Sequence, residues 1–140
     1  MNKRRLLKLA ALLEADAKNR KGVRFDYQQW AYLRNEKAPI SCDTTACALG
    51  LAAISGAFRR AGGLSYYRIF DGKIEFTVNG FLTSALNAAE TVFDLAAAEA
   101  RFIFVPHGGD LFIGARAERA VAKKIRKFVA GEIALVATAW

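Results

Sequence analysis

The two cysteines and the single histidine are the side chains of this chain best suited to nucleophilic chemistry. Cys42 and Cys47 lie at the start of an apolar segment that we predict to be a helix. A thiol at a helix N-terminus has a lowered pKa, because the positive end of the helix dipole stabilises the thiolate. His107 is the only imidazole that could act as the base. The sequence therefore offers Cys42 and His107 as a candidate catalytic pair.

Other interpretations of the same residues stay open. Asp43 beside Cys42 opposes a thiolate, and free cysteines are among the most buried residue types, so both thiols could be packing groups. Cys42, Cys47, His107 and Asp110 could also supply four metal ligands. The gap between the two cysteines suits a zinc site, but His107 and Asp110 make a poor second pair. We therefore expect neither a metal nor another cofactor.

The charge of the chain favours an anionic partner. Its 140 residues include 21 Lys or Arg and 13 Asp or Glu, a net charge of +8. The basic residues concentrate near both ends, and two basic helices could bind phosphates if they lie close together. No helix-turn-helix, RNP or zinc-finger signature accompanies them, and a solvated cationic surface is the alternative. The candidate nucleic-acid-binding residues are Arg4, Arg5, Lys8, Lys123, Arg126 and Lys127.

An apolar stretch organises the elements that must position these residues. Between Ala46 and Phe58 the only polar side chain is Ser55. A helix that is apolar on every side is normally buried on every side. We predict a central buried helix over residues 44–61, which begins at several polar capping side chains and ends before two glycines.

The remaining periodicity predicts a mainly α (α+β) fold. Apolar residues at helical spacing predict further helices, and Asp26 with Gln29 has capping-box spacing. Alternating residues around Asp71-Gly72 predict a small β-hairpin over 66–78. We expect one compact helical domain, residues 1–140, around the buried central helix. The further helices are predicted over 3–19, 26–35, 81–93, 95–105 and 115–130.

Residues 131–140 form an apolar tail whose packing the pattern does not assign. Ile133–Ala137 is too apolar to lie in water, so we expect it to pack on its own domain or to bury in a homodimer. Two cysteines without a disulfide framework indicate a reducing compartment. The chain shows neither a signal-peptide pattern nor an apolar run long enough for a membrane span. We expect a cytoplasmic protein with no membrane partner.

A set of spaced residues along the chain forms a recognisable pattern. These residues are Phe25-Asp26, Trp30, Cys42-x-Thr44-x-x-Cys47-x-x-Gly50, Phe93-x-Leu95, Glu99-Ala100, Phe104-x-Pro106, Ile125 and Phe128. The pattern resembles a family of small uncharacterised bacterial and phage proteins, whose shared mark is Cys-Gly-Thr-x-x-Cys-x-x-Gly opening an apolar helix. The resemblance covers most of residues 5–130 and implies a helical fold, but no activity. The chain differs in having Asp43 where glycine is usual, and in its loop at 107–109.

These observations favour a non-enzymatic binding module with a basic surface and an acidic protein or a nucleic acid as its partner. The alternatives are a thiol-dependent hydrolase or transferase that uses Cys42 and His107, and a dedicated nucleic-acid-binding protein. An enzyme needs an exposed thiol within hydrogen-bond reach of the imidazole. A binding module needs a contiguous basic or apolar surface.

Overall fold

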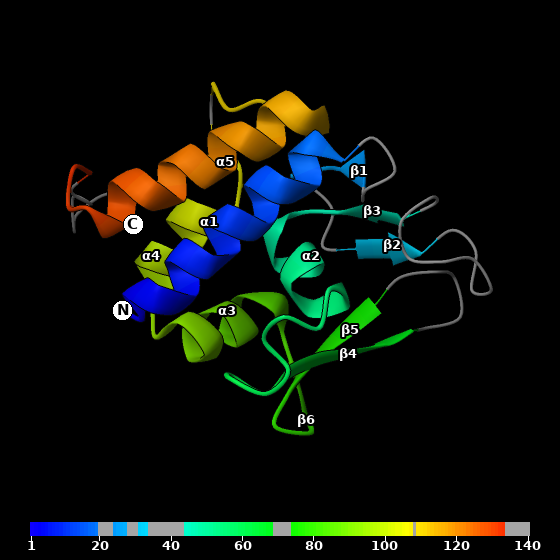
Figure 1. Ribbon diagram of the computed structural model, residues 1–140. Coiled ribbons are helices and arrows are strands. Elements are labelled where there is room, and N and C mark those ends of the chain that lie inside the picture. The colour runs from blue at the N-terminus through cyan, green and yellow to red at the C-terminus, as the bar shows by residue number, and fades with distance from the viewer. Residues whose placement is uncertain (20–23, 28–30, 34–43, 69–73, 108, 134–140) are drawn as a thin grey trace.

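A computed structural model describes residues 1–19, 24–27, 31–33, 44–68, 74–107 and 109–133. Within this part the fold is mainly α (α+β), as predicted, and Figure 1 shows the helices gathered beside two small sheets. The helices are α1 (Lys3–Lys18), α2 (Ala48–Ile54), α3 (Ala85–Phe93), α4 (Ala97–Phe104) and α5 (Gly114–Val129). The strands are β1 (Arg24–Phe25), β2 (Ala31–Leu33), β3 (Thr44–Ala46), β4 (Leu64–Arg68), β5 (Ile74–Val78) and β6 (Phe81–Thr83).

The predicted central helix exists as α2, and every one of its residues is buried. It is shorter than predicted at both ends. Residues 44–46 form β3 instead, because β-branched threonines favour a strand over a helix. The helix ends at Ile54, and Gly56 follows with a φ of +74°, a conformation that favours glycine.

Two long helices, α1 and α5, lie side by side in Figure 1, with the start of α1 and the end of α5 at the same end of the molecule. An apolar stripe on α1 is buried, and Asn2 caps the helix by accepting a hydrogen bond from the Arg5 N–H at 3.1 Å. On α5 the apolar residues Val121, Ile125 and Phe128 are buried. The helices predicted over 3–19 and 115–130 are therefore confirmed.

The predicted hairpin is confirmed as β4 and β5, with Tyr66 opposite Phe76. A third strand, β6, pairs with β5, so the helix predicted over 81–93 is wrong in its first turn. Asn79 and Gly80 both have positive φ and connect β5 to β6 as a tight turn. The helix α3 begins only after Ser84, whose hydroxyl accepts from the backbone of the first turn.

The helix predicted over 26–35 is also wrong. Residues 24–25 and 31–33 instead form strands on either side of β3, parallel and antiparallel to it, respectively. Asp26 pairs with Ile113 across the fold, and the Tyr27 N–H donates to the Phe112 carbonyl at 2.7 Å. Long-range backbone pairing overrides the local capping pattern here.

Buried side chains from all five of these helices form one hydrophobic cluster with the inner face of the hairpin. The predicted helix over 95–105 is confirmed as α4, and it contributes Ile103 and Phe104 to the cluster. No helix in the described part is long and apolar enough to cross a membrane. Most of the apolar tail, residues 134–140, lies outside the described part.

Candidate anion-binding site

A pocket of about 280 Å³ lies between the first two turns of α1 and the segment that follows α2. Its lining is dominated by cations from one helix face. Residues four apart lie on the same side of a helix, so Arg4 and Lys8 point in similar directions. The lining residues are Asn2, Arg4, Arg5, Lys8, Phe58 and Ala61.

Backbone carbonyls hold two of the three cations in place. Arg5 donates from Nη1 to the Val92 carbonyl at the end of α3, over 2.8 Å. Lys8 donates from Nζ to the Ala57 carbonyl over 2.9 Å, and its ammonium lies 5.3 Å from the centre of the Phe58 ring. A carbonyl and an aromatic face orient a cation but do not cancel its charge.

No carboxylate neutralises this pocket among the residues that the structure describes. The nearest ion pair along the chain joins the Met1 amino group to Asp94 over 3.1 Å, and it does not involve the lining cations. Arg4 is exposed and makes neither a hydrogen bond nor an ion pair with described residues. Within the described part of the chain, the positive charge of the pocket is therefore uncompensated.

Two further arginines flank the pocket. Arg59 and Arg60 are exposed, and they stand in the chain between the lining residues Phe58 and Ala61. They are not among the six residues predicted from the sequence, because they fall at the end of the predicted central helix, 44–61. The signal was present as a second Arg-Arg pair, at 59–60, which matches the pair at 4–5.

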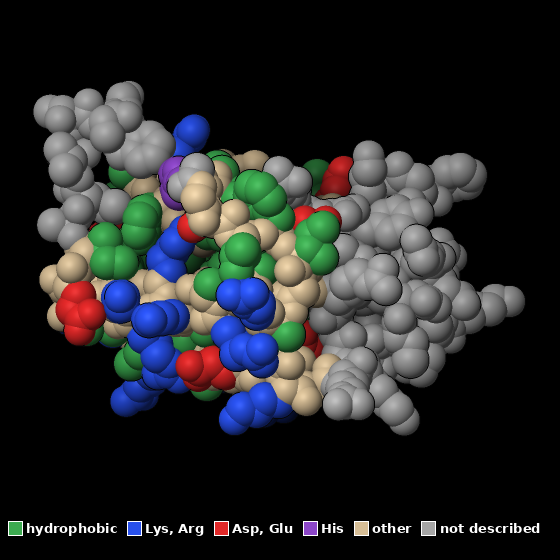
Figure 2. Space-filling view, turned by 90° about the horizontal axis from the view of Figure 1, so that it is seen from above, with side chains coloured by type: hydrophobic (Ala, Val, Ile, Leu, Met, Phe, Trp, Pro, Cys, Tyr) green, Lys and Arg blue, Asp and Glu red, His purple; other side chains and the backbone are tan. Residues whose placement is uncertain are grey.

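The predicted residues on α5 form a second basic group. Lys123, Arg126 and Lys127 are exposed, and Figure 2 shows basic side chains on the α5 side with acidic and apolar side chains between them. Arg126 is bound to Glu14 by two hydrogen bonds, of 2.6 and 3.1 Å. This hydrogen-bonded guanidinium lowers the pKa of Glu14. The Arg126–Glu14 ion pair therefore cancels part of the positive charge on α5.

The six predicted residues therefore do not form one cluster. Lys8 and Glu14 are six residues apart, or about 120° around α1. Lys8 contacts the segment after α2, whereas Glu14 contacts α5. The pocket and the α5 group consequently lie on different flanks of α1.

His107 lies in a different polar cluster, at the loop before α5. Its ring stacks on Phe102, and its backbone N–H donates to the Asp110 carboxylate at 2.8 Å. Lys124 donates to the same carboxylate at 3.2 Å, to the Tyr27 hydroxyl at 2.9 Å and to the Phe102 carbonyl at 3.2 Å. The ammonium also lies near 5 Å from the centres of both aromatic rings, at 5.1 and 5.0 Å. These contacts tie the loop to α5.

The carboxylate and the phenol in this cluster have shifted pKa values. Burial opposes ionisation of Asp110, but hydrogen bonds from the His107 N–H and from Lys124 together lower its pKa. Burial raises the pKa of Tyr27, and the charge of Asp110 raises it further. The cluster thus contains a neutral phenol, Tyr27, and an ion pair between Lys124 and Asp110.

The described cysteine is not a nucleophile. Cys47 precedes α2, is buried, and has a pKa raised by burial to about 12, so its thiol stays protonated. Cys42 lies outside the described residues, and the Cys42–His107 pair stays a prediction. No group of three or more acidic, cysteine or histidine side chains in the described part could hold a metal.

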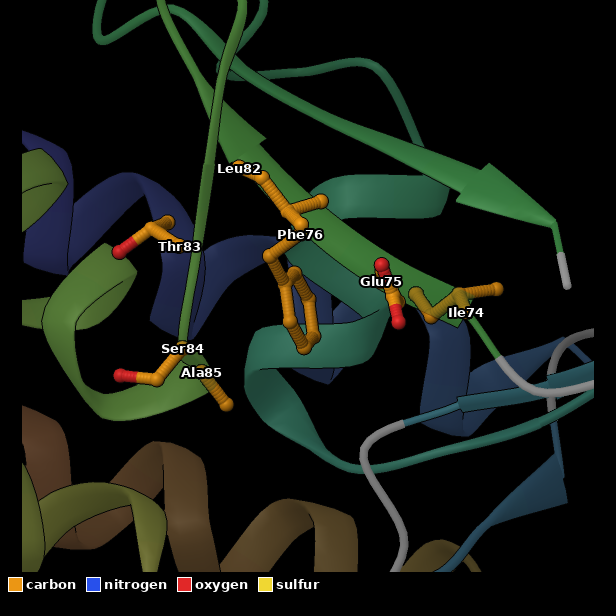
Figure 3. Close-up of a pocket in the computed structure, with 7 residues that line it drawn as sticks. All are labelled: Ile74, Glu75, Phe76, Leu82, Thr83, Ser84 and Ala85. Carbon is orange, nitrogen blue, oxygen red and sulfur yellow. The ribbon is translucent and has the colours of Figure 1, made fainter.

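A larger pocket, of about 490 Å³, opens beside the second sheet. Figure 3 shows the Phe76 ring pointing into the space between β5 and the segment that leads into α3. Among the described residues of its lining, Glu75 is the only charged one. These residues supply no cation for an anionic partner, so they do not support the chemistry that the sequence predicts. The lining residues are Ile74, Glu75, Phe76, Leu82, Thr83, Ser84 and Ala85.

No family model, curated protein or solved structure matches this chain. The resemblance to the bacterial and phage family stays a prediction. The geometry of the basic pocket is therefore the feature of this protein that points to a ligand.

Proposed function

We propose that this protein is a non-enzymatic binding module that holds the phosphate groups of a nucleic acid in the basic pocket beside α1. The observation that carries the proposal is the charge of the lining: Arg4, Arg5 and Lys8 converge without a carboxylate partner in the described part. Like charges that converge repel one another, and a bound anion relieves that repulsion.

The chemistry of the pocket suits phosphate contacts rather than base recognition. Arginine and lysine donate only, and phosphate oxygens accept only. Phe58 is the one aromatic residue among the described lining residues, and it is fully buried, so the described lining offers no exposed ring that could stack on a base. Binding of this kind tolerates any sequence and weakens steeply as salt rises.

The other predictions from the sequence remain predictions. They are an acidic protein partner, a cytoplasmic location, a homodimer formed through the tail and a thiol enzyme at Cys42. No contact in the described part supports any of them over the phosphate proposal. The anionic partner is the proposal with a described site.

The test is fluorescence anisotropy with labelled single-stranded oligonucleotides at about 50 and 200 mM salt. We compare two double variants that lose the same charge: Arg4→Gln with Lys8→Gln in the pocket, and Lys123→Gln with Lys127→Gln on α5. The pocket variant should bind at least about tenfold more weakly than the wild type, since two charge-assisted contacts are lost. The α5 variant should lose only a few-fold.

Two results would contradict the proposal. One is a wild-type protein that binds no oligonucleotide at low salt. The other is an equal loss of affinity in both variants, because general electrostatic attraction would then explain the binding without a site. Circular dichroism confirms that each variant keeps its helices.

A further inference from the structure

We infer that the basic pocket takes the phosphorylated end of a nucleic-acid strand, a phosphomonoester, rather than a phosphodiester within the strand. This inference rests on the proposed function, because it names which phosphate the pocket takes. It follows from the size of the pocket and from the charge of its described lining.

The pocket is small for a stretch of nucleic-acid strand. Its volume is about 280 Å³, and its described lining comes from the start of α1 and from Phe58 and Ala61. A phosphodiester within a strand brings a sugar on both sides, whereas a terminal phosphate brings a sugar on one side only. The terminal group therefore needs less room beside the cations.

The charge of the lining favours a dianion. A phosphomonoester carries about −1.5 to −2 charges at neutral pH, whereas each internal phosphodiester carries one. Three cations line the pocket without a carboxylate partner in the described part. The terminal group therefore matches this charge more closely than an internal phosphate does.

The positions of the donors suit a compact set of phosphate oxygens. Carbonyls already hold Arg5 and Lys8, so neither side chain has to be ordered entirely by the ligand. The Asn2 carbonyl oxygen accepts from the Arg5 N–H, which leaves its amide N–H groups as neutral donors. Arg4 is exposed and has no hydrogen-bond or ion-pair partner in the described part, so its guanidinium can bond to the phosphate without giving up another contact there.

One carboxylate near this site opposes an anion. Asp94 lies beside the start of α1, where it binds the Met1 amino group over 3.1 Å, with 84% of its side chain exposed. That ion pair cancels its charge locally, and the lining residues that the structure describes include no acid. The balance still favours binding of an anion.

The experiment measures the affinity for two forms of one short oligonucleotide, labelled at the 3′ end, with either a 5′-phosphate or a 5′-hydroxyl. We expect the 5′-phosphorylated form to bind about five- to tenfold more tightly, the effect of one additional charge-assisted contact. Arg4→Gln should remove this preference, while Lys123→Gln with Lys127→Gln should keep it. Thermal melting of Arg4→Gln should match the wild type, since Arg4 makes no described contact.

The outcomes separate this inference from the proposed function. Equal, salt-dependent binding of both forms overturns the inference and leaves the proposed function standing. No binding of either form overturns both. A phosphoserine peptide of neutral sequence that binds more tightly than the phosphorylated oligonucleotide also overturns the inference, because the partner would then be a phosphoprotein.

Discussion

The replacement Glu118→Gln should remove a strong pH dependence of stability. Glu118 lies on α5 with 2% of its surface exposed, and its carboxyl is hydrogen-bonded to Asp16 on α1. Two neighbouring carboxyls cannot both ionise cheaply, so the pair keeps a proton. Burial and then Asp16 raise the pKa of Glu118 to about 10, although Arg119 acts in the opposite direction.

The sign of the effect follows from proton binding. The unfolded chain releases this proton above its ordinary pKa of 4.5, while the folded chain keeps it up to about pH 10. The folded state therefore binds more protons between these values, and the free energy of unfolding falls as pH rises through that window. The slope is about 1.4 kcal/mol per pH unit, or about 3 kcal/mol between pH 6 and 8.

The assay is urea unfolding of the wild type and Glu118→Gln at pH 6, 7 and 8. A glutamine keeps the shape and a donor for Asp16 but does not titrate, so the stability difference in its favour should grow by about 1.4 kcal/mol per pH unit. Glu14→Gln is the control, because Glu14 is partly exposed and has a lowered pKa, fully ionised throughout this range. Parallel pH profiles of the wild type and Glu118→Gln would refute the shared proton.

Two other predictions test the polar and thiol sites. Cys47 should resist iodoacetamide in the native protein at pH 8 and react only after unfolding, because burial raises its pKa to about 12; mass spectrometry of the alkylated peptide checks this. Lys124→Met should cost about 1–3 kcal/mol in urea unfolding, because Asp110 and the Tyr27 hydroxyl lose their shared donor. A variant as stable as the wild type would show that the loop does not need this contact.

The elements that could be predicted from sequence are those whose signals are local. For α1, the apolar spacing and the capping residue Asn2 lie within one segment, and the helix predicted over 3–19 is confirmed. For residues 26–35, the local capping pattern predicts a helix, but Asp26 pairs with Ile113 from the far end of the chain. A pairing between such distant residues leaves no periodicity within either segment, so the pattern could not reveal it.

Only part of the candidate site could likewise be predicted from local signals in the sequence. The basic residues Arg4, Arg5 and Lys8 follow from composition and helix position alone. The contacts that hold these cations could not be predicted. Arg5 binds the Val92 carbonyl, 87 positions away, and Lys8 binds the Ala57 carbonyl, 49 positions away. Every residue type has a backbone carbonyl, so the sequence gives no sign of these partners. The separation of the α5 group likewise depends on how the two helices are packed.

The most direct test of the phosphate-binding pocket is a map of amide chemical shifts in the ¹⁵N-labelled protein during titration with a single-stranded oligonucleotide. We predict that the perturbed amides cluster at residues 2–8 and 57–61, which border the pocket, and that those near Lys123 and Lys127 change little. Perturbations concentrated on α5, or around the pocket beside Phe76, would contradict the assignment of this site.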